Sequence, residues 1–146
     1  MTAETSSTSS EQSSARFRVL VVEDEMLLAM QMEDTLADFG CDVVGPVAHV
    51  AEGVKLAGSE SLDGAILDIN VAGAEVFPVA RKLAERSIPF IFVSGYGSGK
   101  LPPEWRSRPT LQKPFYPQDL ARRMAEAFNR QARMRMSKNE FEAPPR

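Results

Sequence analysis

The sequence predicts a doubly wound α/β domain, in which helices cover both faces of a five-stranded parallel sheet. Two observations lead to this prediction. Short apolar runs alternate along the chain with segments whose apolar residues recur at helical spacing. The 146 residues, 43% hydrophobic and 25% charged, also suit a single domain, since domains most often have roughly 100–150 residues.

The two ends of the chain differ in composition from its middle. Residues 1–15 are almost all Ser, Thr and acidic or amide residues, which carry too little apolar surface to offset the entropy of ordering. We therefore expect a disordered leader there. Residues 136–146 end in Ala-Pro-Pro-Arg and are expected to form a flexible tail. The folded domain is accordingly expected over residues 16–135.

The first half of this domain has the pattern strand, helix, strand, helix. The valine-rich run Phe17–Val22 is typical of a buried strand, and apolar residues fall at helical spacing over Glu25–Phe39. Asp42–Gly45 predicts a short second strand, which the proline that follows it is expected to close. A helical apolar stripe covers Val50–Ala57, and we expect Gly58 to end that helix.

The pattern continues with a third strand over Leu62–Ile69 and a helix over Val76–Arg86. Phe90–Val93 is the clearest strand in the sequence, because all four residues are aromatic or β-branched. Three glycines and a Pro-Pro pair interrupt Gly95–Arg108. We therefore expect that segment to be a loop with at most a weak helix.

A short fifth strand is expected over Thr110–Gln112, and a final helix over Pro117–Met134. Strict alternation with short connections favours right-handed crossovers, and the predicted strand order is the flavodoxin-like 2-1-3-4-5. In such sheets a ligand binds beyond the carboxyl ends of the strands, where the winding direction reverses. Polar residues at those ends are therefore the candidates for chemistry.

Five such residues are expected to converge. Glu23 and Asp24 follow the first strand, Asp68 ends the third, Ser94 follows the fourth and Lys113 follows the fifth. Three carboxylates brought together repel one another unless a cation neutralises them. Oxygen ligands without histidine or thiolate suit a hard cation, and a site that also admits water and a phosphoryl oxygen suits Mg²⁺.

This geometry predicts phosphoryl transfer onto a carboxylate. Asp68 would attack phosphorus and become an aspartyl phosphate, while Mg²⁺ and the ammonium of Lys113 neutralise the phosphoryl oxygens. The hydroxyl of Ser94 can donate a hydrogen bond to one of those oxygens. Lys113 is suited to pair with Asp68 before the reaction and with the phosphoryl group after it.

Four motifs resemble those of response-regulator receiver domains in two-component signalling, in the same order and approximate spacing over about residues 16–135. The resemblance assigns the acidic pair to Glu23 and Asp24, and the phosphoacceptor to Asp68. It assigns the hydroxyl switch residue to Ser94 and the lysine to Lys113, with a cis peptide bond before Pro114. It also implies that the backbone carbonyl of Asn70 is a metal ligand. The four motifs are VLVVEDE, AILDIN, FVSGYG and LQKPF.

Two features depart from the usual receiver pattern. The family usually has an aromatic residue three positions before the lysine, and this chain has Thr110 there. The usual coupling between hydroxyl and aromatic residue is therefore expected to be absent or altered. The run from Phe92 to Gly97, FVSGYG, is similar to the atypical receivers nicknamed FATGUY, many of which are stand-alone receivers phosphorylated by HWE-type or related histidine kinases. Tyr96 is either a replacement switch residue or a half-exposed loop residue.

We therefore expect a single-domain response regulator that receives phosphate on Asp68 and signals through protein contacts. Its expected partner is a histidine kinase, possibly of the HWE type, or a phosphotransfer protein. The alternative is a phosphorylation-independent adaptor with the receiver fold, which Thr110 favours. A turnover phosphatase is disfavoured because Asn70 stands where such enzymes place a second acid, so slow self-dephosphorylation at most is expected.

Composition excludes several other classes of function. A net charge of −3 does not suggest binding to nucleic acid, and no apolar run approaches the roughly 18–20 residues of a membrane span. We expect a cytoplasmic protein, with the monomer favoured, and we expect the single cysteine, Cys41, to be a strand residue. His49 is isolated and is expected at the surface. Glu25 is expected to lie at the start of a helix, where its negative charge interacts favourably with the helix dipole.

Overall fold

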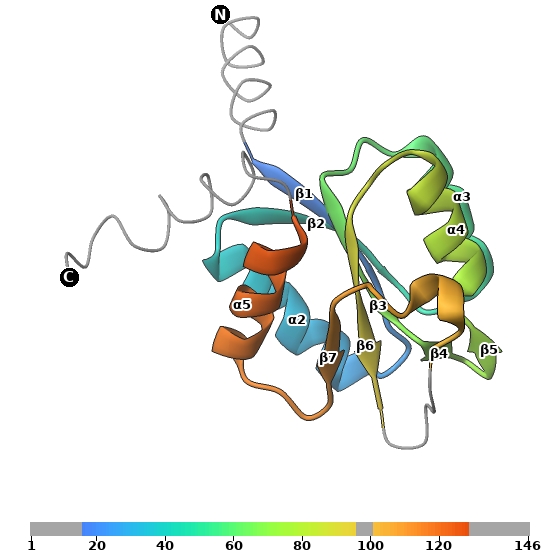
Figure 1. Cartoon of the computed structure of the whole chain (residues 1–146). Helices are drawn as coiled ribbons and strands as arrows, with labels where there is room; N and C mark the ends of the chain where they lie inside the picture. The colour runs from blue at the N-terminus through green and yellow to red at the C-terminus, as the bar shows by residue number, and fades with distance from the viewer. Residues whose placement is uncertain (1–15, 96–100, 129–146) are drawn as a thin grey trace, which may run out of the picture.

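The computed structural model describes residues 16–95 and 101–128 and has a parallel sheet between two layers of helices (Figure 1). The five-stranded sheet has the order β2-β1-β3-β6-β7, with every neighbouring pair parallel. This is the predicted order 2-1-3-4-5. The elements are β1 (Phe17–Val22), α2 (Met26–Asp38), β2 (Cys41–Val47), α3 (Val50–Ser59), β3 (Gly64–Asp68), β4 (Asn70–Val71), β5 (Ala74–Glu75), α4 (Phe77–Glu85), β6 (Phe90–Ser94), the 3₁₀ helix η1 (Pro103–Trp105), β7 (Thr110–Gln112) and α5 (Pro117–Ala127).

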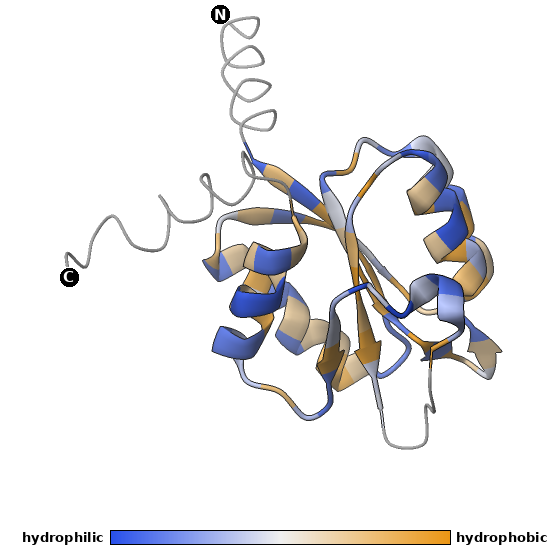
Figure 2. Cartoon of the chain, viewed as in Figure 1, coloured by the Kyte–Doolittle hydropathy of each residue, from blue (hydrophilic) through white to orange (hydrophobic). Residues whose placement is uncertain are grey.

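Side chains that alternate along the strands divide the core into two layers. Val19 and Val21 of β1 face α2 and α5, whereas Leu20 and Val22 face α3 and α4. The same alternation holds in β3 and β6, whose residues are buried on both faces. Figure 2 shows apolar residues along the central strands, and both polar and apolar residues along the helices that flank the sheet. Helices therefore cover both faces of the sheet, as predicted.

Most predicted elements lie within two residues of their expected bounds, and three predicted ends were wrong, one of them at the last helix. Gly58 does not end α3, because the helix continues through Ser59. The second strand does not close at Gly45 but continues to Val47, which pairs with β1 after a register shift. A proline is tolerated there because β2 is an edge strand, so the missing N–H breaks no central ladder.

Other expectations for the chain ends and loops have mixed outcomes. Within the segment expected to be loop, Pro103–Trp105 forms one turn of 3₁₀ helix. The final helix, predicted over Pro117–Met134, ends at Ala127, and Phe128 already has extended backbone angles. The predicted leader and the flexible tail lie outside the described residues, as does Tyr96. In the part of the chain that is described, no helix combines the length and apolar character needed to cross a bilayer.

A short hairpin after β3 was not predicted. Strands β4 and β5 pair antiparallel across Ala72 and Gly73, whose φ angles are 51° and 83°. Two consecutive positive φ angles are the pattern of a type I′ turn, which matches the twist of paired strands. Glycine adopts this conformation freely, and Ala72 adopts it at a cost. The hairpin directs the chain back toward the carboxyl end of β1.

Two glycines of α3 give a matched test of the packing between this helix and the sheet. A Cβ at Gly53 would lie 2.9 Å from Val79 Cγ2 and 3.2 Å from Val22 Cγ2, both buried, whereas a Cβ at Gly58 would make ordinary contact with Lys82. Gly53→Ala should therefore lower the free energy of unfolding by about 1–2 kcal/mol through overpacking. Gly58→Ala should raise it by about 0.5–1 kcal/mol through helix propensity. Urea denaturation measures both, and equal effects of the same sign would contradict the packing described.

Candidate functional site

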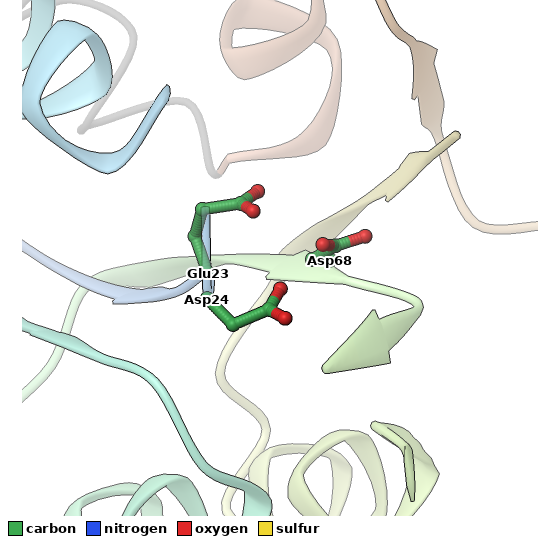
Figure 3. A group of neighbouring side chains, drawn as sticks. All are labelled: Glu23, Asp24 and Asp68. Atoms are coloured by element: carbon green, nitrogen blue, oxygen red, sulfur yellow. The ribbon is translucent and has the colours of Figure 1, made fainter. Parts of the chain in front are cut away.

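Three carboxylates meet at the carboxyl edge of the sheet (Figure 3). Glu23 and Asp24 follow β1 directly, and Asp68 is the last residue of β3. Because β1 and β3 are adjacent and parallel, with Val22 opposite Leu67, their ends reach the same edge. One oxygen from each of the three carboxylates lies within 4.8 Å of the others. The convergence of these three residues that the sequence predicted is therefore present.

Two of these carboxylates are removed from solvent. Glu23 and Asp68 retain 2% and 4% of their accessible surface, and they are the two buried charged residues among those described. Burial raises the pKa of Glu23 to about 7, with the negative charge of Asp68 adding to the effect and the N–H of Glu25 opposing it. Burial also raises the pKa of Asp68, against the lowering effect of Lys113.

Lys113 supplies the positive charge of the site. It follows β7, and its backbone N–H donates to Ser94 O at 2.9 Å. Its Nζ lies 3.2 Å from Asp68 Oδ2, 3.1 Å from Glu25 Oε1 and 3.5 Å from Glu23 Oε1. Burial lowers the pKa of Lys113, but the contacts with these three carboxylates raise it by more. The net shift of this pKa is therefore upward. The expected cis peptide bond between Lys113 and Pro114 is also present.

The donor set fits a hard divalent cation. Glu23 Oε1 is buried without a hydrogen bond, although Lys113 Nζ is 3.5 Å away, whereas Glu23 Oε2 accepts from the N–H of Glu25 at 3.0 Å. Asp24 is exposed and accepts one hydrogen bond, from the N–H of Ala72 at 3.0 Å. Buried polar atoms are normally satisfied, so the unpaired oxygen of Glu23 is suited to bind a cation. Carboxylate oxygens are the ligands that Mg²⁺ prefers.

The other two predicted site residues, Ser94 and Asn70, lie in backbone segments at the same edge of the sheet. Val93 pairs with Asp68 across β6 and β3, and the half-buried Ser94 is the next residue. Asn70 begins β4, two residues after Asp68, and is exposed. The side chain of Lys113 contacts the Asp68 carboxylate directly. The roles of Ser94 and Asn70 remain predictions.

The structure gives Glu25 a contact that the sequence analysis did not predict. Glu25 occupies the N-cap position of α2, but its side chain makes no capping hydrogen bond. It accepts instead from Lys113 Nζ at 3.1 Å. The signal was available, because Glu25 is the third acid of the run after β1 and lies at the same sheet edge. The pairing itself could not be predicted, because Glu25 and Lys113 are 88 positions apart in the sequence.

A buried tryptophan also escaped the sequence analysis. Trp105 in η1 retains 5% of its surface and packs against Phe77, Phe90 and Phe92, with ring centroids 5.8–6.4 Å apart. Thr110 stands at the position where typical receivers have an aromatic residue. It is half-buried, and its hydroxyl donates to Arg108 O. The large aromatic side chain of this region therefore lies five residues earlier in the sequence.

Comparison with known proteins identifies the family. No family model matches the chain. SdrG from Sphingomonas melonis Fr1 is 40% identical, with a TM-score of 0.70 over 76% of this chain and 95% of that one. A response regulator receiver protein from Sinorhizobium medicae WSM419 is 25% identical, with a TM-score of 0.66 over 86% and 98% of the two chains. The chain therefore belongs to the response-regulator receiver domains.

Curated relatives agree with this assignment over part of their length. The phyllosphere-induced regulator PhyR from Methylorubrum extorquens AM1 is 32% identical over 128 residues, which are 83% of this chain and 48% of PhyR. The chain thus spans about half the length of that regulator. SdrG has also been described in a BeF₃-activated conformation, which is 41% identical with a TM-score of 0.63 over 74% of this chain and 92% of that one.

The raised pKa of Glu23 predicts how the metal-free protein responds to pH. Its ordinary value is 4.5, so the folded state binds more protons than the unfolded state between about pH 4.5 and pH 7. The stabilising contribution of Glu23 is thus present below pH 4.5 and lost as the pH rises through about 7. Urea denaturation without divalent metal should show this fall, and Glu23→Gln should weaken it. Glu33→Gln, on the exposed side of α2, should leave it unchanged.

Proposed function

We propose that this chain is a phosphoacceptor receiver that takes a phosphoryl group onto Asp68 from the phosphohistidine of a kinase or phosphotransfer protein. The observation that carries the proposal is the contact of 3.2 Å between the buried Asp68 carboxylate and Lys113 Nζ, beside two further acids. A nucleophilic carboxylate, an ammonium and a cation-binding set are the groups that phosphoryl transfer requires.

In the proposed reaction, one Asp68 oxygen attacks phosphorus and the bond from phosphorus to the histidine nitrogen breaks. The electron pair of that bond stays on the imidazole, which takes a proton. Lys113 exchanges part of its contact with Asp68 for a phosphoryl oxygen, and the Ser94 hydroxyl donates to another. Glu23, Asp24, Asp68 and the carbonyl of Asn70 would hold Mg²⁺, which would neutralise charge on the phosphoryl oxygens.

The known relatives support this proposal. SdrG, 41% identical to this chain, adopts an activated conformation with BeF₃, a chemical mimic of a phosphoryl group. The similarity to FATGUY receivers favours a histidine kinase of the HWE type as the donor. We also propose that the protein is a monomeric cytoplasmic signalling module with slow self-dephosphorylation and no turnover activity.

An adaptor that does not need phosphorylation is the second candidate. Thr110 favours it, because the threonine cannot supply the aromatic side chain that usually couples phosphorylation to a surface change. The buried carboxylates disfavour it, because Glu23 and Asp68 destabilise the fold when charged and unneutralised. Without a function in phosphoryl transfer, this cluster would only lower the stability of the fold.

Phosphorylation of Asp68 can be tested with a small phosphodonor. We expect wild-type protein, Mg²⁺ and acetyl phosphate to give an acyl phosphate that is stable in acid and labile in base, detected by intact mass. Asp68→Asn should lose the label completely, and Asp38→Asn, an exposed acid at the end of α2, should keep it. Failure of the wild type with several donors, including a kinase, would favour the adaptor.

The outer face of α2 offers a surface on which a phosphodonor protein could bind. Met26, Leu27 and Met30 are 76%, 77% and 54% exposed, although they are large and apolar. They begin one residue after Glu25, whose side chain contacts Lys113, so they lie next to the site in sequence. A pocket of about 370 Å³ lies beside them between α2 and the start of α5, lined by Leu28, Gln31, Met32, Asp34, Thr35, Phe115, Tyr116 and Pro117. Exposed apolar groups of this kind mark binding surfaces.

This surface predicts a difference between protein and small-molecule donors. Leu27→Ala combined with Met30→Ala should lower kcat/KM for transfer from the cognate kinase about tenfold, as expected for residues at the centre of an interface. The rate with acetyl phosphate should stay the same, because neither residue contacts the carboxylates. Lys55→Ala on the exposed face of α3 serves as the control. Equal loss with both donors would indicate damage to the site instead.

A further inference from the structure

Glu25 makes the shortest of the three contacts between Lys113 and an acid. Lys113 Nζ lies 3.1 Å from Glu25 Oε1, compared with 3.2 Å to Asp68 Oδ2 and 3.5 Å to Glu23 Oε1. Nζ donates hydrogen bonds to Glu25 and Asp68, whereas its contact with Glu23 Oε1 is an ion pair without a hydrogen bond. A phosphoryl oxygen at Asp68 would therefore approach an ammonium that Glu25 already engages.

The three contacts differ in how easily they can be displaced. Glu23 and Asp68 are buried, and both belong to the group of acids that a divalent cation would neutralise. The side chain of Glu25 is 64% exposed and does not belong to that group. Neutralising the group would weaken the attraction of Glu23 and Asp68 for Lys113 and leave Glu25 as its main anionic partner.

Glu25 is not needed to hold Lys113 near the site. The side chain of Lys113 is only 19% exposed, and its stem passes 3.6 Å from the position that a Cβ on Gly95 would occupy. Packing and the contact with Asp68 thus already restrict the lysine. The side chain of Glu25 also makes no capping hydrogen bond at the start of α2. Its hydrogen bond goes to Lys113 instead.

We propose that Glu25 is a positioning residue that competes with the phosphoryl group for Lys113 and so restrains phosphorylation of this receiver. The inference rests on the proposed function, because it assumes that a phosphoryl group binds at Asp68. In the resting protein Glu25 keeps Lys113 engaged. In the phosphorylated protein, Lys113 turns from Glu25 to the phosphoryl oxygen.

The test is the equilibrium affinity for BeF₃⁻ at saturating Mg²⁺, measured by NMR titration of wild type, Glu25→Gln and Glu25→Asp. Glutamine removes the charge, while aspartate keeps it but is shorter by about 1.5 Å and should not reach Nζ. Because an exposed ion pair contributes little free energy, we expect both variants to bind BeF₃⁻ about two- to fivefold more tightly than the wild type. Glu33→Gln, an equal loss of charge on the same helix, should match the wild type.

The other outcomes are distinguishable. Tighter binding by Glu25→Gln alone would assign the effect to the electric field of the carboxylate and would overturn the competition for contact. Weaker binding by both variants with a lower Tm would show that Glu25 supports the fold, which also contradicts the proposal. A wild-type protein that binds no BeF₃⁻ would reject the receiver function itself, together with the inference that rests on it.

Discussion

The burial of Glu23 and Asp68 beside one another is the constraint on which the site depends. Burial and mutual charge raise the pKa values of Glu23 and Asp68, so the fold keeps these groups at a cost in stability. Lys113 offsets part of that cost and leaves one oxygen of Glu23 without a hydrogen bond. The remaining deficit of positive charge is what makes the site suited to a cation and, with it, to a phosphoryl group.

The parallel sheet makes this unfavourable arrangement possible. Residues on both faces of β1, β3 and β6 are buried, and the two apolar layers fix the register of the strands. With that register fixed, the ends of the strands bring Asp68 beside Glu23 and Lys113 beside Ser94. The hairpin after β3 adds a hydrogen bond from Ala72 to Asp24, so even the exposed acid is oriented by the backbone. The stability of the core thus supports a site that is not itself stabilising.

The segment between β6 and β7 has its own anchor. Trp105 stacks on Phe77 of α4, with the rings 10° from parallel, and meets Phe90 and Phe92 of β6 edge to face. Arg108 lies over the ring of Phe90, 4.3 Å from its centroid. Aromatic contacts of this kind stabilise beyond the area that they bury. The large aromatic side chain therefore holds this segment against α4, whereas Thr110 in β7 makes only a local hydrogen bond.

Local sequence patterns were enough to predict the elements and the residues that meet at the sheet edge. Strand and helix periodicity located the sheet, and the rule about strand ends pointed to Glu23, Asp24, Asp68 and Lys113. The partner of Glu25, the burial of Trp105 and the continuation of β2 through Pro46 are visible only in the folded chain. Each of these depends on which distant residue lies alongside, and no periodicity within a segment records that proximity.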